Sequence, residues 1–240
     1  MKVFDHSFTK IITILAIVLA LLNIVVISGY TVHERRLSRL FSIGCYFVLL
    51  LLFKGYKDKT ITYVFFLLLL ADIFNLYYEH HILGKLISVV KISAYFLLAK
   101  SIFSKLKLLR NTKPILLFFG GIVVALNLVF AFQIVWNTSD EMNDILDLIL
   151  FLIYGIVIIG TIMISIHYNF RYHTRRSMYF VYFIFGLILS DISWFIAYFL
   201  KLFFSFYADI LFYLIALYCM VRYAVETSKN DDVLLFDDEV

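Results

Sequence analysis

The sequence has little of what a soluble domain needs. Only 16% of its 240 residues are charged, it contains a single proline, and 63% of the residues are hydrophobic, which gives a mean hydropathy of +0.96. A soluble chain of this length cannot hide so much apolar surface from water. The composition therefore predicts an integral membrane protein.

Cysteine and the common catalytic motifs are equally scarce. The two cysteines, Cys45 and Cys219, lie in apolar runs, so no disulfide framework or CxxC metal motif is available. None of the six histidines forms HExxH or pairs with another at helical i, i+4 spacing, which disfavours metal catalysis. No GxSxG elbow, P-loop or Rossmann fingerprint occurs. We therefore expect a protein with neither a metal nor a cofactor.

Apolar runs long enough to cross a bilayer, at roughly 20 residues per span, occur eight times. They cover residues 11–29, 38–53, 60–78, 86–103, 115–135, 145–166, 178–199 and 203–225. No small-x-small cleavage pattern follows the first run, so we interpret it as a helix and not as a cleaved signal. The sequence predicts an all-α polytopic membrane protein of about eight transmembrane helices, or seven if one run is re-entrant. These helices form one domain, residues 1–225, followed by a short acidic cytoplasmic tail, residues 226–240.

The placement of lysine and arginine predicts the orientation. With the N-terminus inside, 15 of the 21 basic residues fall in cytoplasmic segments, five fall in outer loops, and Lys91 lies within a helix. The five assigned to outer loops are Arg35, Arg36, Arg39, Lys85 and Lys201. The bias predicts that both termini are cytoplasmic, in the plasma membrane or an inner membrane. The net charge of +4 then reflects basic loops facing anionic lipids, and no nucleic-acid partner is expected.

Two aspartates lie deep within apolar runs. Asp72 is in "LLLLADIFNL" and Asp191 is in "FGLILSDISWFIAYF", and the predicted orientation places both at a similar depth. A lone charge in hydrocarbon costs at least ~2.5 kcal/mol, so each aspartate needs a partner, a proton or a task. The two windows share an aliphatic run, a small residue, Asp and Ile, and they lie about half the chain apart. This similarity suggests two parallel four-helix halves that contribute one aspartate each.

Other polar residues accompany these aspartates at helical spacing. Such stripes predict a polar cavity in the outer half of the bundle, with Lys91 as the only cation able to neutralise several carboxylates. The stripes are Asp72, Asn75 and Glu79; Ser88, Lys91 and Tyr95; Asp147, Tyr154 and Thr161; and Asp209 with Tyr213. Simpler interpretations remain for some members. Asp147 and Glu79 lie near helix ends, where they can face headgroup water, and Asp209 with Lys91 can form a structural ion pair.

The number of helices and the two aspartate windows resemble the YhhN family of membrane lysoplasmalogenases. In that family the first window carries Gly-Asp and the second ends in Ser-Asp; here Ala71 replaces the glycine, whereas Ser190 and Asp191 match. The resemblance implies hydrolysis of the vinyl ether bond of a lysophospholipid, with release of a fatty aldehyde. Its partners would be this lipid substrate and the surrounding membrane lipids.

The chemistry of an enol ether can be argued without the resemblance. Hydrolysis needs a proton delivered to carbon, stabilisation of an oxocarbenium ion, and attack by water, and two carboxylates suffice for this. We expect Asp72 and Asp191 to be the catalytic pair, with either one as the acid. Supporting or substrate-binding roles fall to Asn75, Lys91, Ser190, Asp209 and Tyr154, with Lys91 as the counter-ion or as a contact to a phosphate headgroup.

Two other functions use the same features. A small proton-coupled transporter can employ paired intramembrane acids with a lysine as a proton relay or cation site. A non-enzymatic membrane module, such as a sensor or assembly partner, would leave the cavity without turnover. Close helix packing is the interpretation of four glycines in apolar runs, Gly120, Gly121, Gly155 and Gly160.

Overall fold

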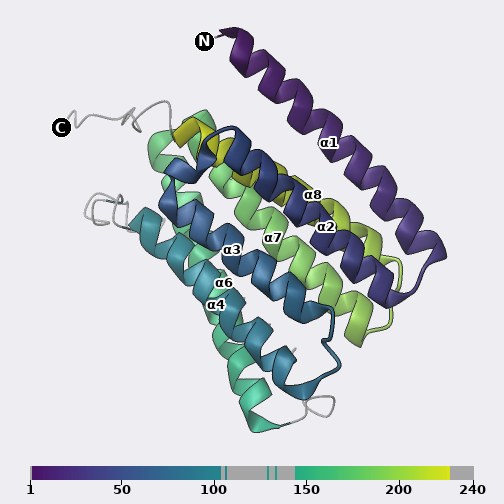
Figure 1. The fold of residues 1–240 in the computed structure, drawn as a ribbon. Coiled ribbons are helices and arrows are strands. Elements are labelled where there is room, and N and C mark those ends of the chain that lie inside the picture. The colour runs from purple at the N-terminus through teal and green to yellow at the C-terminus, as the bar shows by residue number, and fades with distance from the viewer. Residues whose placement is uncertain (1, 104–105, 107–128, 130–132, 134–143, 228–240) are drawn as a thin grey trace.

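The structure is a computed structural model that describes residues 2–103, 106, 129, 133 and 144–227, with side chains from residue 7 onward. Seven α-helices have described bounds (Figure 1). They are α1 (Lys2–Gly29), α2 (Val32–Leu52), α3 (Lys59–Asn75), α4 (His81–Phe103), α6 (Ile145–Tyr172), α7 (Arg175–Phe199) and α8 (Ser205–Thr227). A short 3-10 helix, η1 (Gly55–Lys57), lies between α2 and α3.

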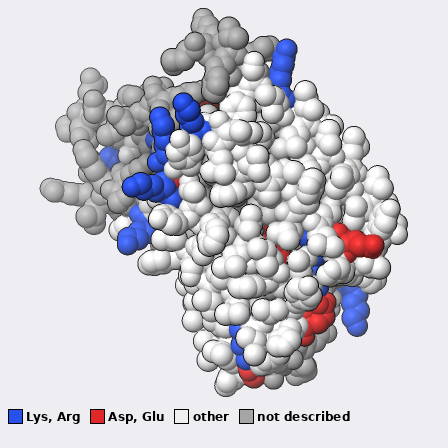
Figure 2. Space-filling view, in the orientation of Figure 1, with Lys and Arg blue, Asp and Glu red and all other residues white. Residues whose placement is uncertain are grey.

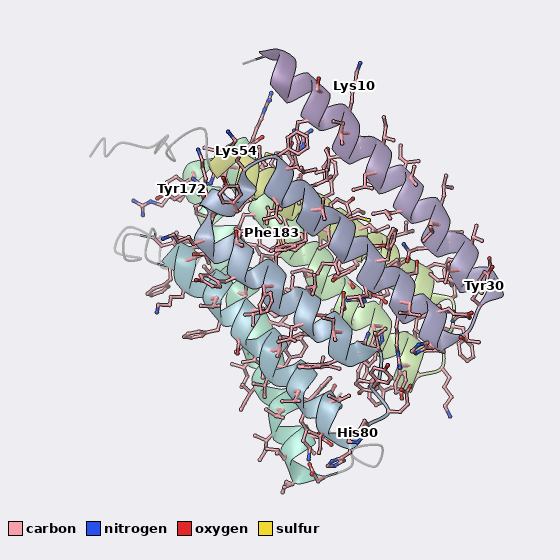
Figure 3. All side chains as sticks on the ribbon, in the orientation of Figure 1. Lys10, Tyr30, Lys54, His80, Tyr172 and Phe183 are labelled. Atoms are coloured by element: carbon pink, nitrogen blue, oxygen red, sulfur yellow. The ribbon has the colours of Figure 1, made fainter. Side chains whose placement is uncertain are left out.

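Six of these helices close a ring, and the seventh packs outside it. Neighbours in the ring are α2 and α3, α3 and α4, α4 and α6, α6 and α7, α7 and α8, and α8 and α2. Helix α1 lies along the outside and contacts α2 and α8 (Figure 1). We call one end of the bundle the His80 end, where the turns 30–31, 76–80 and 200–204 lie, and the other the Lys54 end, where the turns 53–58 and 173–174 lie (Figure 3).

The Lys54 half of the ring is filled by aromatic side chains. Phe65, Phe180, Phe183 and Tyr168 are each fully buried, and Figure 3 shows Phe183 inside the bundle. The Phe180 ring lies 5.6 Å from the ring of Tyr168 and 4.9 Å from that of Phe183, as measured between centroids. Aromatic pairs at these separations stabilise a core beyond the area that they bury. The described part of this half therefore has an aromatic core.

The outer surface is apolar. Figure 2 shows charged side chains gathered toward the two ends of the molecule, with a broad uncharged band between them. On α1, Ile14, Leu21 and Val25 are each at least 60% exposed. Five described helices are long and apolar enough to span a membrane: Ser7–Gly29 of α1, α4, α6, α7, and Ser205–Glu226 of α8. The chain is therefore a multi-pass helical membrane protein, since lipid is the solvent that such a surface needs.

Several sequence-based helix bounds need correction. Helix α2 begins at Val32 and not at residue 38, so the three arginines assigned to an outer loop lie in a helix. Helix α3 ends at Asn75, and α8 continues to Thr227, into the predicted tail. Apart from residues 129 and 133, the predicted helix 115–135 lies outside the described residues, as does the rest of the tail. Eight spans and two four-helix halves therefore stay predictions.

Helix starts are fixed by side-chain caps. The Asp58 carboxylate accepts a hydrogen bond from the backbone N–H of Ile61 at 3.1 Å at the start of α3. Thr174 and Ser177 cap α7 reciprocally, each side chain bonded at 3.0 Å to the other residue's backbone N–H. These bonds satisfy N–H groups that the first turn of a helix leaves free. The caps set where α3 and α7 begin and thus the depth of the aspartates that they carry.

A buried polar network joins α1 to the ring. Asn23, which is 2% exposed, donates to the hydroxyl of Ser42 at 2.9 Å and accepts from the hydroxyl of Ser38 at 2.8 Å. We expect Asn23→Leu to lower the free energy of unfolding by about 1 kcal/mol, because such interhelical bonds contribute modestly in membranes. Thermal unfolding in detergent would measure this. Ser28→Ala on the same helix, where the exposed hydroxyl bonds only to the Val25 carbonyl oxygen, is the control; equal melting of the two variants would contradict a role for the network.

Candidate active site

One polar residue from each ring helix points to a common region toward the His80 end. These residues are Arg39 of α2, Asp72 of α3, Lys91 of α4, Tyr154 of α6, Asp191 of α7 and Asp209 of α8. They divide into two hydrogen-bonded groups, one around Arg39 and one around Lys91. The six-helix ring therefore surrounds a polar centre, built above the aromatic core.

The first group has a buried arginine shared by two aspartates. The Arg39 Nε donates to Asp72 Oδ1 at 3.2 Å, and its Nη1 donates to Asp209 Oδ1 at 2.6 Å. Tyr213 donates its hydroxyl to Asp72 Oδ2 at 2.5 Å, and its ring centroid lies 3.9 Å from the Arg39 Cζ. Ser190 donates to Asp209 Oδ1 at 2.5 Å. Because each of these five side chains belongs to a buried residue, the group relies on its own bonds in place of water.

The second group surrounds Asp191. Its Oδ1 accepts a hydrogen bond from the Lys91 ammonium group, and its Oδ2 accepts from the hydroxyls of Tyr154 and Tyr95, the latter at 3.0 Å. The Asp191 side chain is 11% exposed and that of Lys91 is 18% exposed, so this pair is more accessible than the Arg39 group. Ser190, the residue before Asp191, bonds to Asp209. The backbone of α7 thus connects the two groups directly.

Both groups border one cavity of about 360 Å³. Among its lining residues are Arg39, Asp72, Lys91 and Asp191, and its wall toward the His80 end is largely aromatic, formed by Tyr78, Phe151, Tyr154, Trp194, Phe195, Tyr198 and Phe199. The size lies in the range of small-molecule sites, and the mixture of apolar wall with a few convergent polar groups is typical of them. The predicted polar cavity is therefore present.

Ion pairs stand at the rim of the cavity. Arg36 donates to Glu79 at 2.9 Å, and this hydrogen bond holds the pKa of Glu79 below its ordinary value. Lys85 pairs with Asp144, which also accepts from the backbone N–H of Asp147 at 3.0 Å; these bonds, that of Lys85 first, lower the pKa of Asp144. The rim carboxylates are thus ionised at neutral pH.

A cluster of metal-ligating types lies beside Lys85. His81, Asp144 and Asp147 have ligand atoms within 4.8 Å of one another. Asp144 is already engaged as the cap of α6 and as the partner of Lys85. These contacts account for its position, and we assign the cluster no catalytic role.

The structure places the sequence-predicted residues unevenly around the cavity. Asp72, Asp191, Asn75, Lys91 and Tyr154 all line it. Ser190 and Asp209 do not line the cavity. They contact its lining indirectly, since Ser190 donates to Asp209 and Asp209 accepts from Arg39. Two expectations were wrong: Asp209 pairs with Arg39 and not with Lys91, and Lys91 is not the only cation of the centre.

Arg39 is the main residue that sequence reasoning missed. It was counted with the outer loop because it lies only one residue inside the predicted run 38–53. The capping box formed by Thr31 and Glu34 is the sequence signal that would have predicted the earlier start of this helix. In the structure the Glu34 carboxylate accepts a hydrogen bond from the Thr31 backbone N–H at 2.7 Å. A helix that begins at residue 32 places Arg39 two turns in, with Ser42 and Tyr46 continuing one face at i+3 and i+7.

The formal charges of the two groups differ. Asp72 and Asp209 share one arginine, so the first group carries a net charge of −1 when its carboxylates are ionised. Asp191 and Lys91 form a neutral pair. The Arg39 group can therefore stabilise a positive charge that develops in the cavity. The Lys91–Asp191 pair can exchange a proton between its amine and its carboxylate.

Comparison of the chain with protein-family models, with curated proteins and with solved structures gives no match. The assignment to the class of multi-pass helical membrane proteins with an ionisable centre therefore rests on the sequence and structure of this chain.

Proposed function

We propose that this protein is a membrane-embedded hydrolase of the lysoplasmalogenase type, which cleaves the vinyl ether bond of a lysophospholipid. One observation carries the proposal: Asp72 and Asp191, from opposite halves of the chain, line the same cavity with different counter-ions. The resemblance of their two windows to the YhhN family favours this reaction over other uses of paired acids. The aromatic wall offers a surface for the hydrocarbon next to the ether.

In this proposal Asp72 is the carboxylate that stays ionised. Its partner Arg39 does not give up its proton in proteins, and the negative charge of the Arg39 group is available to the cavity through Asp72. A carboxylate in this position stabilises the oxocarbenium ion electrostatically and accepts a proton from the attacking water. Tyr213 and Arg39 are positioning residues that fix its two oxygens.

Asp191 is then the proton donor. Its neighbour Lys91 can lose a proton, so transfer from Nζ to Oδ1 gives a neutral amine and a carboxylic acid without separating charge. The acid donates its proton to the vinyl carbon, which leaves the Asp191 carboxylate beside a neutral Lys91 amine that still donates an N–H to it. Tyr154 and Tyr95 orient the second oxygen throughout.

The steps balance without a cofactor. The vinyl double bond takes up the proton at its outer carbon, which leaves an oxocarbenium ion at the ether carbon. Water forms a bond to that carbon and passes a proton to Asp72, which gives a hemiacetal. When the hemiacetal breaks its bond to the glycerol oxygen, Asp72 returns its proton to that oxygen, which leaves as an alcohol. The hemiacetal O–H passes its proton to the Asp191–Lys91 pair, which restores the ammonium group and the carboxylate, and the fatty aldehyde is released. The net reaction consumes one water.

A proton-coupled transporter has less support. It needs a polar path to the far side of the bundle, whereas the core of the described Lys54 half is largely aromatic, with Thr161 and Ser165 as the chief buried polar residues of α6 there. Given the positive-inside pattern, we infer that both termini are cytoplasmic and that the cavity faces the other side of the plasma membrane or an inner membrane.

Aldehyde release from a lysoplasmalogen by the purified protein tests the proposal. We expect Asp72→Asn and Asp191→Asn each to lower turnover about a hundredfold or more, since each removes an acid or base function. Asp58→Asn is the matched control, because an asparagine still caps α3 at the Lys54 end. Absence of turnover in the wild-type protein across several headgroups, with folded yield confirmed, would reject the hydrolase and make proton flux the next assay.

A further inference from the structure

A second, smaller cavity borders the polar centre at Arg39 and Asp209. Its volume is about 30 Å³, and it lies among α1, α2 and α8 at the His80 end. It shares three lining residues with the main cavity, namely Arg39, Asn75 and Trp194. These three side chains therefore form a partition with a cavity on each side.

The lining of the second cavity combines polar and apolar side chains. Asn23, Arg35, Arg36, Asn75 and Asp209 contribute polar groups in addition to Arg39, whereas Ile27, Val32, Phe206 and Ile210 are apolar. A cavity needs about 10 to 15 Å³ and two to four polar partners to hold a water molecule. The volume suits one or two water molecules and is too small for a phosphate or a headgroup.

Two polar groups that line this cavity, the carboxylate of Asp209 and the amide of Asn75, have atoms that are not hydrogen-bonded to other described residues. Within the described part of the chain, Asp209 uses Oδ1 for Arg39 and Ser190, and no bond reaches its Oδ2. The side-chain amide of Asn75 likewise has no hydrogen-bond partner among those residues, although it lies at both cavities. Asp209 is buried and Asn75 is half-buried, and polar groups at a cavity without a protein partner are the ones that ordered water satisfies.

We propose that the second cavity binds water and supplies it to the main site through the partition at Asn75. The inference rests on the proposed function, because hydrolysis consumes one water and a lipid substrate seated against the aromatic wall shuts the main cavity to bulk water. Asn75 lies one turn after Asp72 on α3, so a water held by its amide stands beside the carboxylate that accepts the proton. The substrate and the water thus enter from different sides.

The route reaches the surface beside Val32, the first residue of α2. Val32 lines the second cavity and is 37% exposed. A tryptophan at position 32 is large enough to fill the second cavity from its surface end, because the cavity has room for only one or two water molecules. Leu37 provides a matched control, because it is also on α2, is 43% exposed and lines neither cavity.

Hydroxyl-radical footprinting of the full chain tests the water site without any substrate. Radicals generated from bound water modify adjacent side chains, so we expect Phe206, which is 7% exposed, to be modified in the wild-type protein well above the fully buried Phe183. Modification of Phe206 should fall about fivefold in Val32→Trp and not in Leu37→Trp, because a cavity filled by a side chain holds no water. Equal protection of Phe206 and Phe183 in the wild-type protein would overturn the proposal.

Aldehyde release by the same three proteins tests the supply of water. We expect kcat to fall about tenfold in Val32→Trp with little change in KM, since the substrate still binds while water addition becomes slow. If Val32→Trp loses the Phe206 modification but keeps the same kcat as Leu37→Trp, the second cavity does not supply the water for hydrolysis. Absence of turnover in the wild-type protein with a strong Phe206 footprint would reject the hydrolase and leave the hydrated cavity standing.

Discussion

Replacement of Arg39 by methionine should lower the free energy of unfolding by about 3 to 5 kcal/mol, the usual cost of removing one partner from a buried ion pair. The side chain is shared by Asp72 and Asp209, and all three residues are at most 7% exposed. Methionine matches the length of the arginine stem and leaves two buried carboxylates without a cation. Thermal unfolding of the purified protein in detergent, followed by far-UV circular dichroism, measures the loss.

Two further variants separate this effect from a general loss of packing. Arg35→Met changes the same residue type one turn earlier on α2, where the described residues give arginine an aromatic contact, Phe206 at 5.2 Å, and no carboxylate partner. We expect it to cost less than about 1 kcal/mol. Addition of Asp209→Asn to Arg39→Met should recover part of the stability, because one uncompensated charge is removed. Equal stability of the Arg39 and Arg35 variants would show that Arg39 does not neutralise these aspartates.

The sequence predicted the location of the acids better than that of their partners. Asp72, Asn75, Lys91 and Tyr154 sit at helical spacing on apolar helices, and the cost of burying polar groups in lipid is enough to predict a shared cavity. The pairing could not be deduced in the same way. Three aspartates and two cations meet at the centre, and only the order of helices around the ring decides which carboxylate each cation reaches.

The ring order itself depends on packing between helices distant in sequence. Helix α2 contacts α8, at the other end of the chain, and this contact brings Arg39 to Asp209 across 170 residues. A hydrophobic run reports that a helix crosses the membrane, not which helices flank it. Sequence periodicity therefore predicted the class of fold and the cavity, while the closure of the ring by α2 and α8 required the structure.

The glycines show the same limit. Close helix approach was predicted at Gly120, Gly121, Gly155 and Gly160. A Cβ added to Gly160 meets no atom within 4 Å, Gly120 and Gly121 lie outside the described residues, and Gly155 stays a prediction. The tight position is Gly186 on α7, where an added Cβ would lie 2.9 Å from the Ala216 Cβ and 2.9 Å from the Phe212 carbonyl oxygen. A glycine in an apolar run marks a position where helices are able to approach, and the partner helix decides whether they do.

Substitution of Gly186 by alanine should therefore destabilise the protein by about 1 to 3 kcal/mol, the cost of overpacking a tight contact. The Phe212 carbonyl oxygen belongs to the backbone of α8, so relief requires α7 and α8 to move apart along the most extensive helix contact of the described bundle. Because Asp191 and Ser190 lie on α7 and Asp209 on α8, we also expect turnover to fall. Thermal unfolding and aldehyde release measure the two effects.

Gly160→Ala is the matched control, since it adds the same methyl group to α6 in open space and should leave stability unchanged or slightly raised. Ala216→Gly in the Gly186→Ala background removes the contact between the two Cβ atoms but not the contact with the Phe212 oxygen. It should therefore restore only part of the stability lost in Gly186→Ala. Full restoration would mean that the side chain of Ala216 alone limits the approach of the helices. Equal melting of Gly186→Ala and Gly160→Ala would mean that α7 and α8 are not held this closely, in which case the link between Ser190 and Asp209 loses its structural basis.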